Sequence, residues 1–96
     1  MKAKIDNFNS WVPLSKEDKL TSELQSLIKE SGFTILNFID HNFHPHGYTA
    51  IWLLAESHFA LHTFPEANKS YVELSSCNSE MFVEFIVLFH KWLKTC

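Results

Sequence analysis

Residues 55–66 read AESHFALHTFPE, and Cys77 lies further on in the segment LSSCN, residues 74–78. Apolar, strand-like segments lie on both sides of Glu56 and Ser57, at residues 48–55 and 58–64. The stretch also places a serine hydroxyl beside a peptide bond, with His58 and His62 close by in the sequence. Together with the thiol of Cys77, these groups are suited to covalent chemistry on the serine.

Two helices are predicted outside this stretch, from apolar residues that recur one helical turn apart. The first stripe consists of Leu20, Leu24, Leu27 and Ile28. Ser15 and Asp18 resemble a capping box at its start, and Gly32 ends it. The second stripe consists of Phe82, Phe85, Phe89, Trp92 and Leu93. Asn78 or Ser79 is the expected cap, and we interpret this aromatic stripe as core or dimer interface.

Further strands are predicted at residues 5–12, 33–39 and 71–74. Residues 41–47 are expected to form a loop or irregular strand, because Pro45 and Gly47 interrupt a ladder. The order strand, helix, four strands, helix predicts an α+β fold. We expect one domain over residues 1–96, built as a two-layer sandwich with a mainly antiparallel sheet and both helices packed on one face. The other face of the sheet then needs a partner, and a homodimer is the simplest solution.

Composition restricts the class of protein. The chain has 96 residues, of which 46% are hydrophobic and 15% aromatic, so a packed core is expected. The net charge of −3 without a basic stripe makes nucleic acid a poor partner. No apolar run approaches the roughly 20 residues of a membrane span, and the first residues lack a signal-peptide pattern. Two cysteines form no disulfide framework, so we expect a cytoplasmic protein.

These motifs resemble the prokaryotic class of S-adenosylmethionine decarboxylases, which are pyruvoyl-dependent lyases of polyamine biosynthesis. The resemblance rests on ESH at residues 56–58, HTFPE at residues 62–66, and Cys77. Looser support comes from Ser31-Gly32 and from residues 43–47. It covers about the middle half of the chain, and the joint spacing is more specific than any single motif.

The resemblance implies self-processing at the Glu56–Ser57 bond. In the family, the serine attacks the preceding carbonyl, the amide becomes an ester, and elimination leaves a pyruvoyl group at a new N-terminus. Ser57 is then the precursor of the covalent cofactor, and the chain becomes two pieces. The resemblance gives His62 the role of base in processing and Thr49 that of an assisting hydroxyl.

The resemblance also implies how the processed enzyme acts. The pyruvoyl carbonyl forms a Schiff base with the amino group of S-adenosylmethionine and accepts electrons as carbon dioxide leaves. Cys77 returns a proton to the substrate. Phe43 stacks on adenine, and the Glu66 carboxylate accepts from the ribose hydroxyls. The product is the aminopropyl donor for spermidine synthesis.

Other functions stay open at this point. The chain has Phe64 and Asn78 where the family commonly has tryptophan and glycine, and it ends after the last predicted helix. An uncleaved, non-catalytic paralogue with a nucleoside-binding or regulatory role is therefore an alternative. A pyruvoyl decarboxylase acting on arginine or ornithine is another. Histidines 41, 44 and 46 cluster, but no cysteine pair accompanies them, so we expect no metal site.

Overall fold

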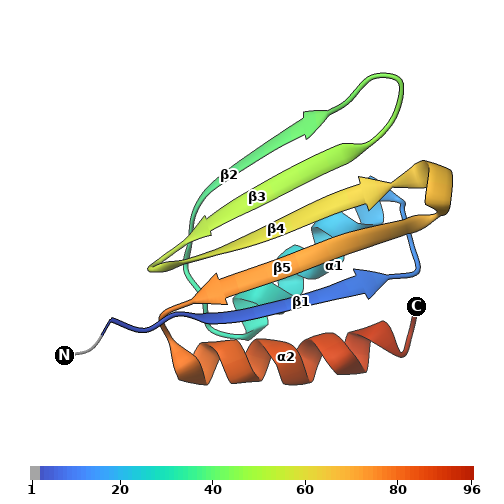
Figure 1. The fold of residues 1–96 in the computed structure, drawn as a ribbon. Coiled ribbons are helices and arrows are strands. Elements are labelled where there is room, and N and C mark those ends of the chain that lie inside the picture. Colours follow the sequence, from blue (N-terminus) through green and yellow to red (C-terminus); the bar gives the residue numbers. More distant parts are fainter. Residues whose placement is uncertain (1–2) are drawn as a thin grey trace.

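A computed structural model of the chain describes residues 3–96 and contains a five-stranded antiparallel sheet and two α-helices (Figure 1). The elements in chain order are β1 (Asp6–Val12), α1 (Glu17–Glu30), β2 (Ile35–Asn42), β3 (Tyr48–Leu54), β4 (Ser57–Phe64), the short 3-10 helix η1 (Pro65–Ala67), β5 (Lys69–Ser76) and α2 (Ser79–Leu93). The strands lie in the order β1-β5-β4-β3-β2. The predicted α+β class and helix number are confirmed.

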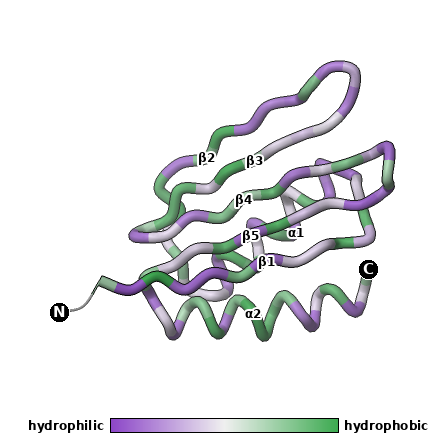
Figure 2. Tube along the Cα trace, in the orientation of Figure 1, coloured by the Kyte–Doolittle hydropathy of each residue, from purple (hydrophilic) through white to green (hydrophobic). Residues whose placement is uncertain are grey.

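The two faces of the sheet differ because successive strand residues point to opposite sides. In β4, Phe59 and Leu61 are fully buried against the helices, whereas His58 is exposed on the other side. Both helices cover the same face of the sheet (Figure 1), and hydrophobic and hydrophilic residues alternate along α2 (Figure 2). Phe85 and Phe89 of α2 are fully buried, so the aromatic stripe is part of the core.

The face without helices, here called the open face, exposes several large apolar side chains. Trp11 is 51% exposed, Ile39 68%, Ile51 41% and Leu53 50%. Strand register places all four on the same side as His62, because Ile39 pairs with Ile51 and Trp11 pairs with Tyr71, which pairs with His62. An exposed apolar face of this kind is typical of a surface that meets another protein.

Some predicted boundaries were wrong. The capping box does not form, because α1 begins at Glu17 with Lys16 as the cap residue, and the Ser15 hydroxyl instead donates to Asn68 Oδ1 at 3.3 Å. The strand predicted at residues 33–39 instead spans Ile35–Asn42, and its last two residues, His41 and Asn42, pair with β3.

Other boundary signals were correct. Gly32 follows the end of α1 with a φ of 100°, a left-handed conformation that suits glycine. Asn78 caps α2 and accepts from the Met81 amide at 2.9 Å. No helix within residues 3–96 is long and apolar enough to cross a membrane.

Candidate active site

The turn between β3 and β4 holds the bond that is predicted to be cleaved. β3 ends at Leu54 and β4 begins at Ser57, so Ala55 and Glu56 alone form the turn. Glu56 has a φ of 59°. This left-handed conformation costs a residue with a side chain about 1–2 kcal/mol. The Glu56–Ser57 bond therefore follows a strained residue at the exposed end of a hairpin.

The carbonyl of Glu56 already accepts a hydrogen bond from the backbone N–H of Cys77 at 3.3 Å. This contact follows from register, because Ser57 pairs with Ser76 and the next residue of the chain then lies opposite the turn. The thiol of Cys77 is exposed and free. The structure thus brings together three of the predicted residues: Glu56, Ser57 and Cys77.

Ser57 points to the face that the helices cover. The residue is 8% exposed, and its Oγ donates to Ser76 Oγ at 2.8 Å. Ser76 is fully buried, accepts from the Asn78 N–H at 2.9 Å and donates to the Asn78 carbonyl at 3.3 Å. Sequence reasoning missed Ser76, although a serine that continues the buried alternation of Val72 and Leu74 was a usable signal.

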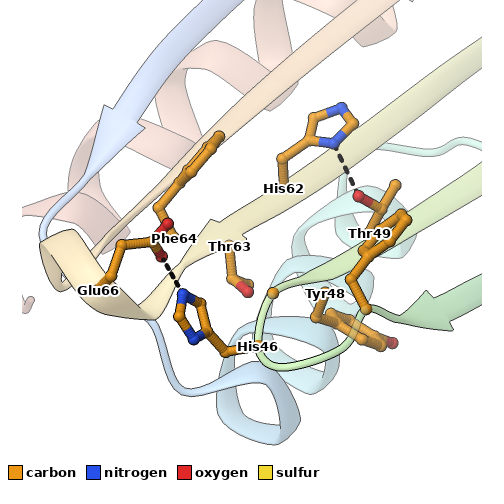
Figure 3. Close-up of a pocket in the computed structure, with 9 residues that line it drawn as sticks. His46, Tyr48, Thr49, His62, Thr63, Phe64 and Glu66 are labelled. Atoms are coloured by element: carbon orange, nitrogen blue, oxygen red, sulfur yellow. Dashed lines mark hydrogen bonds and ion pairs between the residues drawn. The ribbon is translucent and has the colours of Figure 1, made fainter.

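Thr49 and His62 form a second group on the open face. They are directly paired across β3 and β4, and Thr49 Oγ1 lies 2.9 Å from His62 Nδ1 (Figure 3). On its other side the imidazole faces the Tyr71 ring, with centroids 6.5 Å apart and an interplanar angle of 29°. Two residues with separately predicted roles in processing are therefore in contact, and Tyr71 is a neighbour that sequence reasoning did not identify.

A cavity of about 320 Å³ adjoins this pair (Figure 3). Its lining includes Phe43, Thr49, His62 and Glu66, so four predicted residues share one cavity. Phe43 is 51% exposed, so it is not part of the core. His46 Nε2 lies 3.6 Å from Glu66 Oε1, so protonated His46 forms an ion pair with that carboxylate.

Within one chain the two groups lie at opposite ends of β4. Ser57 and His62 are five residues apart on this strand, which is about 16 Å at roughly 3.3 Å per residue. An odd separation also places their side chains on opposite faces. The structure therefore does not bring the predicted base, His62, to the predicted nucleophile, Ser57, inside a single protomer.

Tyr48 is the first residue of β3 and lines the cavity. Its hydroxyl donates to Asp40 Oδ2 at 2.7 Å and accepts from Thr21 Oγ1 at 3.4 Å. Burial, and then the hydrogen bond to the Asp40 carboxylate, raises the pKa of Tyr48 to about 12. The phenol is therefore neutral at physiological pH and ties β2 and β3 to α1.

The histidine cluster at residues 41, 44 and 46 does not assemble with other ligands. Among residues 3–96, no group of three or more histidine, cysteine, aspartate or glutamate side chains is arranged to hold a metal ion. His41 instead packs edge-on against Phe43, with ring centroids 4.7 Å apart. His41 therefore contributes to the surroundings of Phe43.

Comparisons with known proteins identify the family of the chain. The model of the S-adenosylmethionine decarboxylase family matches residues 8–94. A protein from Parasynechococcus marenigrum (strain WH8102), named S-adenosylmethionine decarboxylase proenzyme, is 38% identical over 71 residues, which are 74% of this chain and 56% of that protein. A protein of the same name from Archaeoglobus fulgidus is 31% identical over 71 residues, 74% of this chain and 63% of that protein.

The matched part of the chain thus spans little more than half the length of these relatives. The crystal structure of the adenosylmethionine decarboxylase from Aquifex aeolicus VF5 superposes with a TM-score of 0.69 at 20% identity. The superposition covers 94% of this chain and 77% of the other. It supports the fold described above.

Proposed function

Because the chain belongs to the S-adenosylmethionine decarboxylase family, we propose that it is a self-processing, pyruvoyl-dependent decarboxylase of S-adenosylmethionine. Its product is the aminopropyl donor for spermidine synthesis. The observation that carries this proposal is the Glu56–Ser57 bond, which follows a left-handed residue and whose carbonyl accepts from the Cys77 N–H. The word proenzyme in the relatives' names fits a chain that is activated by cleavage.

Self-cleavage begins at the serine hydroxyl. Ser57 Oγ attacks the carbonyl carbon of Glu56, the new C–O bond replaces the C–N bond, and the hydroxyl proton passes to the released nitrogen. The Cys77 N–H, 3.3 Å from the carbonyl oxygen, stabilises the negative charge that develops there. The barrier is lowered further because the strained turn opens.

Elimination then completes the cut. The Cα of Ser57 loses a proton, the Cβ–Oγ bond breaks, and Glu56 leaves with a free carboxylate. The remaining dehydroalanine takes up water and releases ammonia, which leaves a pyruvoyl group on residue 57. The two pieces are residues 1–56 and 57–96.

The site suits such a group. In the uncleaved chain, Ser57 at the start of β4 is buried, the Ser76 hydroxyl lies 2.8 Å from its Oγ, and the Cys77 thiol is exposed. The Oγ of Ser57 leaves with Glu56, so the pyruvoyl group occupies the remaining space beside Ser76. The carbonyl of a pyruvoyl group withdraws the electrons that a departing carboxylate leaves on the substrate. We assign to Cys77 the return of a proton to that carbon. Phe43 and Glu66 bind the adenosine part, as a ring for stacking and a carboxylate for the ribose hydroxyls.

In a homodimer, the Ser57 end of β4 of one protomer can meet the His62 end of its partner, although the Ser57 side chain itself points to the helix-covered face. Two copies that pack open face to open face about a twofold axis place the Ser57 end of one protomer against the His62 end of its partner. Each of the two sites then contains Ser57 and Cys77 from one chain, and Phe43, Thr49, His62 and Glu66 from the other. The exposed apolar side chains of the open face support this assembly.

Two exposed free thiols suit a reducing cytoplasm.

Intact-mass measurement of purified protein tests the proposal. We expect two fragments that meet between residues 56 and 57, the second with a pyruvoyl end that reacts with carbonyl-trapping reagents. Ser57→Ala is expected to remain a single chain. A wild-type chain that stays whole after long incubation would refute the proposal in favour of the uncleaved paralogue. Release of labelled carbon dioxide from S-adenosylmethionine, compared with arginine and ornithine, identifies the substrate.

Mixing variants tests the shared site. Co-expressed Ser57→Ala and His62→Ala chains form some mixed dimers, in which one site combines an intact Ser57 with an intact His62. We expect the His62→Ala chain to be cut in the mixture and to stay whole by itself. Equal cleavage in both conditions would exclude a site shared between protomers.

A further inference from the structure

We propose that Ser76 is a positioning residue for self-cleavage, which holds both the Ser57 nucleophile and the Cys77 amide in place. This inference rests on the proposed function and assigns a role to a residue that the motifs do not include. Ser76 is fully buried, and its hydroxyl uses all of its hydrogen-bonding capacity. It accepts from Ser57 Oγ and from the Asn78 N–H, and it donates to the Asn78 carbonyl.

The first effect is on the direction of the nucleophile. A free serine side chain samples three rotamers. Here the 2.8 Å bond to Ser76 holds Ser57 Oγ on the covered side of the sheet, where the residue is 8% exposed and water competes little. Among the described residues none donates to Ser57 Oγ, so its lone pairs stay free for attack. Donation to Ser76 also leaves the Ser57 oxygen more electron-rich.

The second effect is on the carbonyl that is attacked. The two contacts between Ser76 and Asn78 close a tight loop around Cys77. This loop directs the Cys77 N–H to the Glu56 oxygen at 3.3 Å. Asn78 in turn caps α2 through Met81, so the loop is fixed to a helix. One hydroxyl therefore sets the nucleophile and the oxyanion donor relative to each other.

Two substitutions of equal shape test the role of the hydroxyl. Ser76→Thr keeps the oxygen and adds a methyl group, whereas Ser76→Val has the same branched shape without the oxygen. We expect the threonine chain to be cleaved within about threefold of the wild-type rate. We expect the valine chain to be cleaved about 10–100-fold more slowly, since small errors in orientation carry costs of this size. The measurement is the rate of fragment appearance by intact mass.

A matched control separates orientation from stability. Ser70 is also fully buried on β5, and its hydroxyl donates to the Leu14 carbonyl at 2.7 Å, at the opposite end of the strand. Ser70→Ala is expected to lower the melting temperature and to leave the cleavage rate unchanged. Hydroxylamine, which cuts esters, should not rescue Ser76→Val, because the defect precedes ester formation.

The outcomes are distinct. Cleavage of the threonine chain with slow cleavage of the valine chain supports the inference. Equal rates for these two chains, whether fast or slow, would overturn it and leave the proposed function intact. A wild-type chain that is never cut would refute the proposed function itself.

Discussion

The left-handed conformation of Glu56 can be measured as strain by comparing two small residues at this position. Glu56→Ala keeps a Cβ at a φ of 59°, whereas Glu56→Gly removes it. Relief of the left-handed conformation is worth about 1–2 kcal/mol. The greater freedom of glycine in the unfolded chain offsets about 0.5–1 kcal/mol of this. The glycine chain should therefore be more stable by about 0.5–1 kcal/mol.

The stability difference is measured in chains that cannot be cut. Both substitutions are placed in a Ser57→Ala background and melted at the same protein concentration, since a dimer's melting temperature depends on concentration. At about 4–8 °C per kcal/mol for a domain of this size, the glycine chain should melt about 2–8 °C higher.

The same strain should affect the cleavage rate when Ser57 is present. Cleavage starts from the folded chain, where the unfolded-state freedom of glycine does not enter, so relief of about 1–2 kcal/mol in the glycine chain should slow the cut by about 5–30-fold, given tenfold per 1.36 kcal/mol. Both variants lack the Glu56 side chain, and the released carboxylate belongs to the backbone, so neither variant differs from the other in a group that takes part in the cleavage. Equal melting temperatures together with equal cleavage rates would refute this reasoning.

Four further predictions follow from the described contacts. Cys77→Ala should still be cut but should release little labelled carbon dioxide, because the proton donor is missing; normal turnover would exclude the assigned role. Ile51→Lys places a charge on the open face, so sedimentation should show monomers and intact mass should show little cleavage. The control Val83→Lys, at an exposed apolar position on α2, should leave the oligomeric state and the cleavage unchanged. Phe85→Ala empties a fully buried site and should lower the free energy of unfolding by about 3–5 kcal/mol in denaturant titrations. The folded chain holds the Tyr48 proton more tightly than the unfolded chain, so the free energy of unfolding should fall as the pH rises from about 10 to about 12. Urea titrations across that pH range measure this decline. Tyr48→Phe should lack the part of the decline that Tyr48 causes.

Local signals predicted the features that depend on neighbouring residues. The end of α1 just before Gly32 follows from backbone conformation, and the cap of α2 at Asn78 follows from a single side-chain contact. The capping box failed for the opposite reason, because the Ser15 hydroxyl finds Asn68, far away in the sequence. The extension of β2 through Asn42 likewise depends on pairing with β3, which no local pattern encodes.

In the candidate site, too, some features depend on neighbouring residues and others on residues far away in the sequence. The spacing of Thr49 and His62 gave no sign that they are paired across two strands, because that requires the hairpin register. The odd separation of Ser57 and His62 was readable, however, since a period of two places them on opposite faces of β4. Ser76 was missed because its partner Ser57 is fixed by the register of β4 with β5.

The order of strands determines how a nicked molecule stays together. A break after residue 56 leaves β1, β2 and β3 on one polypeptide and β4 and β5 on the other. β5 is hydrogen-bonded to β1, and β4 is hydrogen-bonded to β3. The hairpin of the second fragment therefore lies between strands β1 and β3 of the first fragment. Neither fragment can dissociate unless the hydrogen bonds of both the β1–β5 and the β3–β4 pairs break. Cleavage therefore produces a new chain end while the sheet stays intact.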